Sequence, residues 1–245
     1  MKKWIIYFIG LSALPLFYGC DKEGACLKST GKIVSENRVA LPYNCVEVYD
    51  NINLFLTQDT ALSEIRVEAG ENLIAGITTD IDSGKLILRN ANSCDWLRSF
   101  EVPVNVYLKF IRLDTLIFQA AGNITCLNEW TNDSIFVNVI EGAGKLNFNL
   151  DVDRSVIHVR FGTVSLNITG KSPVTFISSQ GYGPVHAEDL ISKFTYVYTF
   201  SPNDVFVYAS EQLGVEIGNI GNIYYRGNPK DIDANIYGDG KLIEF

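Results

Sequence analysis

The residues able to carry out acid–base or nucleophilic chemistry are few. The chain has two histidines, His158 and His186. A Ser-His-Asp or Cys-His site needs a histidine beside a nucleophile, and no GxSxG motif is present. The strand pattern described below places His186 on an outward position and His158 within a strand. We therefore expect surface histidines, and the sequence predicts a protein that is not an enzyme.

A carbohydrate-active enzyme is an alternative that uses other residue types. Some β-helix enzymes cleave acidic polysaccharides with carboxylates, arginine or lysine on an outer strand face. Here the charged outward residues Glu188 and Arg226 are predicted to lie two coils apart, roughly 10 Å by strand spacing. The net charge of -8 would repel an acidic polymer. This function remains a second alternative.

Exposed aromatic side chains beside an arginine offer a different chemistry. Such a group is suited to stack on a sugar ring or to contact a protein. It would also arise where side chains cover the last strands of a fold or form an interface between molecules. The predicted patch consists of Phe206, Tyr208, Tyr224, Arg226 and Phe245.

The cysteines do not form a metal-binding pattern. Cys26, Cys45, Cys94 and Cys126 show no CxxC motif and no nearby histidine, so neither a metal nor a cofactor is expected. In an exported protein disulfides are plausible. Four cysteines allow three connectivities, and their spacing does not choose between them.

The N-terminus has the features of an export signal. Lys2 and Lys3 precede an apolar run that ends at Gly19-Cys20, and residues 1–19 are predicted to be a lipoprotein signal peptide. The end of this run, "LFYGC", resembles a bacterial lipobox, in which Cys20 would be lipidated. A plain secretory signal is the alternative. We expect an outer-membrane lipoprotein of the cell envelope, facing the periplasm or the surface and touching the membrane only through the lipid.

The charge of the mature chain limits its partners. Residues 1–19 contain two lysines and no acidic residue, so their removal changes the net charge from -8 to -10. An acidic chain is a poor partner for nucleic acid. Residues 20–44 are expected to form a tether and lead-in.

An internal repeat is the strongest signal in the chain. A glycine, or once an asparagine, stands two residues before a β-branched residue or leucine in seven windows: AGNITCL (121–127), AGKLNFN (143–149), FGTVSLN (161–167), YGPVHAE (182–188), PNDVFVY (202–208), IGNIYYR (220–226) and DGKLIEF (239–245). The predicted corner residues are Gly122, Gly144, Gly162, Gly183, Asn203, Gly221 and Gly240. A corner between strands often needs positive φ, which glycine tolerates freely and asparagine tolerates best among the others.

The windows also predict which side chains face the core. Fourth positions are β-branched or leucine, and most sixth positions are apolar, so these should point inward while the fifth and seventh point outward. Glu244 breaks this rule in the last window. The chain ends on that window, so an earlier loop or a second molecule is expected to cover its open edge. A weak homodimer is one outcome.

The spacing of the windows predicts the fold class. Short strands that recur with a period of roughly 20 residues predict a parallel β-helix, or β-solenoid, in which stacked coils share one core. The alternative is a β-sandwich of hairpins. Residues 45–245 would form this domain, with less regular coils or a β cap over 45–110 and seven regular coils over 111–245.

The order of motifs resembles a known family. "VYDNINLFLTQDT", "IRVEAGENLI", "GKLILRN", "GNIYYRGNP" and "GDGKLI" occur in this order and look like the head GIN domain putative auto-transporter adhesins. The resemblance covers about residues 45–245 and implies an exported bacterial lipoprotein with a β-helical fold and no catalytic residues. It also implies a pairing of Cys26 with Cys94.

The function expected from these observations is an adhesin-like binding module that is anchored by lipid and takes a glycan or a surface protein. The first alternative is a structural envelope protein that acts by self-association.

Overall fold

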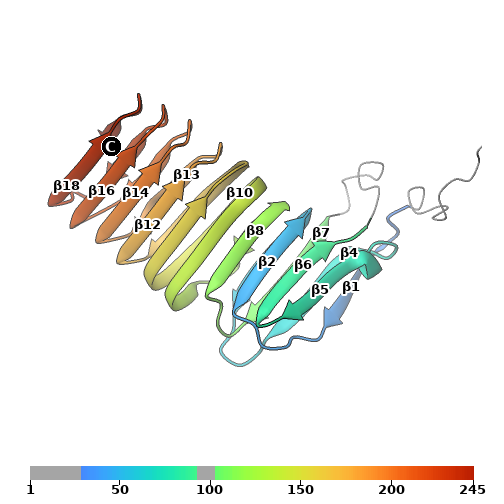
Figure 1. Ribbon diagram of the computed structural model, residues 1–245. Coiled ribbons are helices and arrows are strands. Elements are labelled where there is room, and N and C mark those ends of the chain that lie inside the picture. Colours follow the sequence, from blue (N-terminus) through green and yellow to red (C-terminus); the bar gives the residue numbers. More distant parts are fainter. Residues whose placement is uncertain (1–28, 93–102) are drawn as a thin grey trace, which may run out of the picture.

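The protein is a β-solenoid in which almost every ordered segment is a strand. The computed structural model describes residues 29–92 and 103–245. Within them the strands stack side by side into a rod (Figure 1), and one short 3-10 helix, η1 (Ile74–Gly76), is present. Most pairings are parallel and join a strand to the equivalent strand of the next coil. The predicted solenoid is confirmed, and the β-sandwich alternative is wrong.

The strands form two stacks that enclose one core. The front stack in Figure 1 contains, in spatial order, β5 (Ile77–Asp82), β6 (Lys85–Asn90), β2 (Cys45–Asp50), β8 (Thr115–Ala121), parts of β10 (Trp130–Val159), β12 (Val174–Ser179), β14 (Phe194–Thr199), β16 (Gln212–Ile217) and β18 (Asp231–Ile236). The rear stack contains β1 (Ile33–Arg38), β4 (Glu64–Gly70), β7 (Val104–Phe110), β3 (Ile52–Gln58), β9 (Ile124–Cys126), the middle of β10, β11 (Thr163–Lys171), β13 (Val185–Ile191), β15 (Val205–Tyr208), β17 (Ile223–Arg226) and β19 (Leu242–Glu244).

The N-terminal coils do not stack in chain order. β2 and β3 lie between β6 and β7 on one side and β8 and β9 on the other. The intervening chain forms β4 and β5, which pair antiparallel with β7 and β6 and are joined by η1. β1 pairs antiparallel with β4. Residues 33–38, predicted to be part of a tether, are therefore a strand of the terminal layer.

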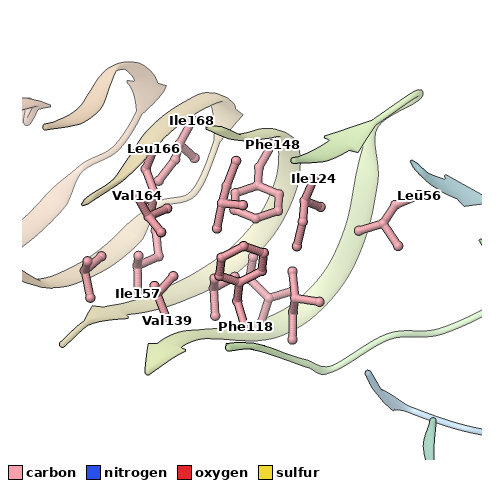
Figure 2. Close-up of a cluster of buried hydrophobic side chains, with 14 of the residues drawn as sticks. Leu56, Phe118, Ile124, Val139, Phe148, Ile157, Val164, Leu166 and Ile168 are labelled. Atoms are coloured by element: carbon pink, nitrogen blue, oxygen red, sulfur yellow. The ribbon is translucent and has the colours of Figure 1, made fainter. Parts of the chain in front are cut away.

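The inward side chains of both stacks meet in one hydrophobic core (Figure 2). Phe118, Val139 and Ile157 from the front stack and Ile124 and Phe148 from the rear stack are all buried in it. Full burial of an aliphatic or aromatic side chain contributes about 1.5–3 kcal/mol. No coil encloses such a core alone, so stacking is what stabilises the coils.

The seven windows of the repeat supply seven neighbouring strands of the rear stack. Ile124 pairs with Leu146, and Val185, Val205, Ile223 and Leu242 pair in succession, all in the predicted register. The third window is displaced by two positions, because Val164 pairs with Gly144 and Leu166 pairs with both Leu146 and Val185.

The glycine column is set by close packing more than by backbone conformation. Gly144 and Gly162 have positive φ, at 135° and 94°. The expectation of positive φ is wrong for the remaining corner residues Gly122, Gly183, Asn203, Gly221 and Gly240. A Cβ at Gly183 would lie 1.9 Å from the carbonyl oxygen of Val164, in the coil below. The column therefore needs glycine where a corner rests on the preceding coil.

The C-terminal end of the rod is an open edge. β18 pairs with β16 alone, and β19 pairs with β17 alone. All six residues of β18 are exposed, and Figure 1 shows this strand at the end of the rod. No segment among residues 29–92 and 103–245 pairs over this edge, so the expected cover by an earlier loop is not found there.

Candidate ligand-binding surfaces

The predicted aromatic patch forms a stacked ladder on the outward side of the rear stack. The ring of Phe206 stacks on His186 at 4.7 Å and on Tyr224 at 4.8 Å, with interplanar angles of 10° and 11°. Phe245 lies edge-on to Phe206 and Tyr224, at 5.9 and 6.1 Å. The ring faces of Phe206 are thus occupied by its neighbours, which leaves little open platform for a ligand.

The arginine of this patch is already paired. Arg226 donates from Nε to the backbone oxygen of Glu188 at 2.9 Å, and its guanidinium forms an ion pair with Asp189. Tyr208 is its register neighbour in the preceding coil. The structure therefore brings Phe206, Tyr224 and Phe245 together and adds His186, while Arg226 is held by the chain itself.

The two histidines lie on different stacks, and each contacts an aromatic ring. Among residues 29–92 and 103–245, no group of three potential metal ligands is found. His158 packs edge-on against Phe136 at 5.1 Å, and burial together with nearby Arg160 lowers its pKa. Both effects favour the neutral form of His158.

A second surface, missed by the sequence analysis, lies on the outward side of the front stack. It is a hollow of about 400 Å³ that crosses the end of β10 and strands β12, β14, β16 and β18. We call this hollow the front groove. Its main lining residues are His158, Phe176, Tyr196, Tyr198, Gly214, Glu216, Asp233 and Asn235.

Strand register explains the hollow. Phe176, Tyr196, Gly214 and Asp233 are aligned in successive coils and form one outward row. The rings of Phe176 and Tyr196 stack at 4.9 Å, but Gly214, in the next coil, has no side chain to continue the ladder. The second side of the Tyr196 ring lies over Gly214, and both residues line the hollow. The Tyr196 hydroxyl donates to Oε1 of Gln212 at 2.9 Å, which fixes the ring.

The neighbouring outward row supplies polar groups. Ser178, Tyr198, Glu216 and Asn235 are aligned beside the aromatic row. Desolvation, followed by interactions with Tyr198 and Glu216, raises the pKa of Tyr237 to about 12. Tyr237 thus interacts with Tyr198 and Glu216, two residues that line the groove. The groove thus combines an aromatic face with the carboxylates of Glu216 and Asp233.

Two signals in the sequence mark this groove. In the strand "FTYVYT" every outward residue is aromatic and the inward residues are threonine and valine. The strand "QLGVEI" carries a glycine in its interior. A glycine inside a strand often marks close approach of another group. A Cβ on Gly214 would meet Cδ1 of Tyr196 at 2.8 Å.

The described cysteines are free thiols. Cys45 and Cys126 form no disulfide, and burial raises the pKa of Cys126 to about 12. The predicted lipidation site Cys20 and the predicted pair Cys26 and Cys94 lie outside the described residues.

These features define the class of the protein as a β-solenoid whose outward strand faces carry aromatic and polar surfaces. The chain belongs to the family described as "Putative auto-transporter adhesin, head GIN domain", whose model matches residues 42–229. This membership groups it with adhesin-like proteins of the envelope or surface.

Solved structures share the fold at low sequence identity. A putative adhesin from Bacteroides fragilis matches with a TM-score of 0.82 and 18% identity, over 87% of this chain and 97% of its own. A putative adhesin from Parabacteroides distasonis has a TM-score of 0.66 and 19% identity, over 88% and 98%. A putative lipid binding protein from the same organism has a TM-score of 0.62 and 16% identity, over 89% and 98%.

No curated protein matches the sequence. In the portion of the chain that the structure describes, no helix is long and apolar enough to cross a membrane.

Proposed function

We propose that the protein is an exported, lipid-anchored binding module of the cell envelope and that its front groove binds a glycan. The observation that carries this proposal is that the aromatic ring of Tyr196 lines the groove together with the carboxylates of Glu216 and Asp233. A sugar presents a face of C–H groups that packs on an aromatic ring, and hydroxyl groups that donate to carboxylates.

The dimensions of the groove suit a single ring on Tyr196. Tyr196 and Asp233 lie two coils apart in the same outward row, a separation of roughly 10 Å at the spacing of neighbouring strands. The coil between them contributes only Gly214 to this row. The Tyr196 ring leans over Gly214, so a sugar ring would pack on the aromatic row where it lines the hollow.

Charge narrows the class of glycan. The whole chain carries a net charge of -8, and Glu216 and Asp233 line the groove. An acidic polysaccharide would be repelled. A neutral or amino-bearing glycan is the ligand that these groups favour.

The proposed role is binding without catalysis. The groove is an open hollow along the outer strand face, so it does not exclude water from a bound ligand as a catalytic site commonly does. Release of shortened products from a bound glycan would contradict this role and support a carbohydrate-active enzyme.

A binding screen with paired variants tests the proposal. The exported domain, starting after Cys20, is screened against neutral, amino-bearing and acidic glycans, and hits are measured by calorimetry. Tyr196→Ala should weaken binding at least about tenfold, the scale of a lost hot-spot contact. The matched control is Tyr224→Ala in the rear stack, which should leave binding unchanged.

Three results would overturn the proposal. No saturable binding to any glycan would remove the proposed ligand class. Loss of binding in Tyr224→Ala, with Tyr196→Ala unaffected, would assign the ligand to the rear ladder. Saturable binding to a surface protein instead of a glycan would favour the protein ligand that the sequence left open.

A further inference from the structure

The two ends of the rod differ in how far the inward apolar side chains are buried. At the N-terminal end Ile65, Val67 and Ile77 of the antiparallel strands are at most 1% exposed. At the C-terminal end Ile232 and Ile236 occupy inward positions opposite Leu213 and Ile217, yet they are 42% and 44% exposed. Within residues 29–92 and 103–245, no segment covers these apolar side chains or pairs with the strand edge beside them.

We propose that this edge binds a second copy of the chain. β18 of each copy would pair antiparallel with β18 of the other, continuing the front stack across the junction. Both backbone edges are unpaired in the monomer, and an unpaired edge is a template for another strand. In the described part of the chain the other end also has unpaired edges, on β1 and β5. Because β18 pairs with β18, the contact is made by the same surface on both copies. Such an isologous contact closes as a dimer and does not extend into a fibre.

The sequence of β18 selects one register. Residues opposite each other in antiparallel strands point to the same side of a sheet. Pairing centred on Ala234 places Ile232 opposite Ile236 of the partner subunit on the inward side. It also places Asp233 opposite Asn235 of the partner subunit on the outward side. A register centred on Asp233 would instead oppose two aspartates, and directly opposed like charges are destabilising.

The dimer would also lengthen the front groove. Asp233 and Asn235 line the groove and belong to β18, so in a monomer the groove ends at the open edge. In the proposed register the grooves of both copies meet at the twofold axis. This consequence rests on the proposed glycan function, whereas the dimer does not, because it is measured without any ligand.

One residue opposes the association and makes it weak. Glu244 pairs with Tyr225, which packs against the core, so Glu244 occupies an inward position on β19. A carboxylate at the open end of the core is a known protection of exposed edges. Burying it in a dimer costs desolvation energy. The structure thus predicts opposite effects for changes on β18 and on β19.

Sedimentation velocity at several concentrations tests these effects. Ile232→Lys combined with Ile236→Lys should raise the dimer dissociation constant at least about tenfold, because it places charges in the apolar contact. Glu244→Leu should lower it about tenfold, because it removes a buried charge. Ile191→Lys, a matched change at an exposed isoleucine of β13, should leave it unchanged.

A cysteine cross-link tests the register. Directly opposite residues of antiparallel strands have Cα atoms about 4.5–5.5 Å apart, within the range of a disulfide. Ala234→Cys should therefore form a disulfide-linked dimer under mild oxidation. Asp239→Cys, in the turn of the same coil, should not. Circular dichroism of every variant checks that the fold is kept.

The inference fails on clear results. A dimer that resists the β18 double change, or that Glu244→Leu does not strengthen, places the contact elsewhere. A monomer at all concentrations, for both the natural chain and Glu244→Leu, excludes the dimer. Equal cross-linking at positions 234 and 239 contradicts the register.

Discussion

The ring of Tyr196 lies over Gly214 of the next coil, so close that a Cβ on Gly214 would meet Cδ1 of the tyrosine at 2.8 Å. On its other face the same ring stacks on Phe176. The ladder of outward aromatic residues therefore ends at a residue without a side chain, which lies within the front groove.

Filling this space should remove binding without unfolding the protein. Gly214→Val would displace the Tyr196 ring and occupy the hollow, so glycan affinity should fall at least about tenfold. Calorimetry measures the affinity, and thermal unfolding checks the fold. Ser165→Val, on the outward side of the rear stack, is the control and should bind normally. Unchanged affinity in Gly214→Val would exclude the groove as the site.

Substitutions at Gly84 and Gly183 should distinguish the effect of close packing on stability from the effect of backbone conformation. Gly84 has φ of 80°, and its added Cβ would meet only Oδ1 of Asn44 at 3.6 Å. Gly84→Asn should therefore cost less than about 1 kcal/mol. Gly183→Asn should cost more than about 2 kcal/mol, because its Cβ would overlap the Val164 carbonyl and force the coils apart.

Gly162 combines both constraints. Its φ is 94°, and its Cβ would lie 2.0 Å from the carbonyl oxygen of Gly142. Gly162→Asn and Gly162→Val should thus be similarly destabilising, although asparagine tolerates positive φ. Urea unfolding of these variants measures the differences. Equal losses in Gly84→Asn and Gly183→Asn would show that packing on the preceding coil is not the deciding factor.

Buried acidic groups should make the protein less stable at alkaline pH. Burial raises the pKa of Cys126 to about 12 and also raises the pKa of Tyr43. A free thiol ionises near pH 8.5, so above that pH the unfolded chain loses a proton that the folded chain keeps. Stability should therefore fall as pH rises from about 8.5 to 12.

Two measurements check this linkage. The free energy of unfolding should decrease with pH over that range, and the slope should be smaller in Cys126→Ala. Native Cys126 should also resist alkylation at pH 8 and react once the protein is unfolded. Rapid alkylation of Cys126 in the native protein would contradict its burial as a protonated thiol.

The proposed lipid anchor is Cys20, which lies outside the described part of the chain. Cys20→Ala should move the exported protein from the membrane fraction to the soluble fraction, because the acyl chains that bind the bilayer would be missing. Cys26→Ala, a matched change in the segment that follows, should stay anchored. Retention of the Cys20→Ala protein after a carbonate wash would show that Cys20 is not the anchor.

The repeat can be predicted because it is a local pattern. Fourth positions such as Ile124 and Val205 are apolar and face the core, and six of the seven windows pair in the predicted register. The third window is misaligned because its glycine does not stand at the register position. Gly162 rests on Gly142, whereas Val164, two residues later, pairs with Gly144. Placing the window on Gly162 makes the steps between the windows uneven, and this unevenness is the warning that the sequence contains.

The terminal layer and the front groove could not be predicted in this way. "SGKLILR" matches the window, but Ser83 and Gly84 form a hairpin turn and the strand β6 joins the front stack. The insertion of β2 and β3 depends on contacts between distant segments. The groove depends on which coil lies beside which, since Tyr196 and Gly214 belong to different coils and their meeting follows from register alone.

The insertion of β2 and β3 also determines the order in which the chain can fold. These strands are synthesised before both of their neighbours in the rod, β6 and β7 on one side and β8 and β9 on the other. They can pair on both sides only once the chain reaches Cys126, and such distant contacts are slow to form. From β10 onward each coil adds directly to the one before it. We therefore expect folding to begin in the C-terminal coils and to reach the N-terminal layer last. This order is opposite to the direction of synthesis.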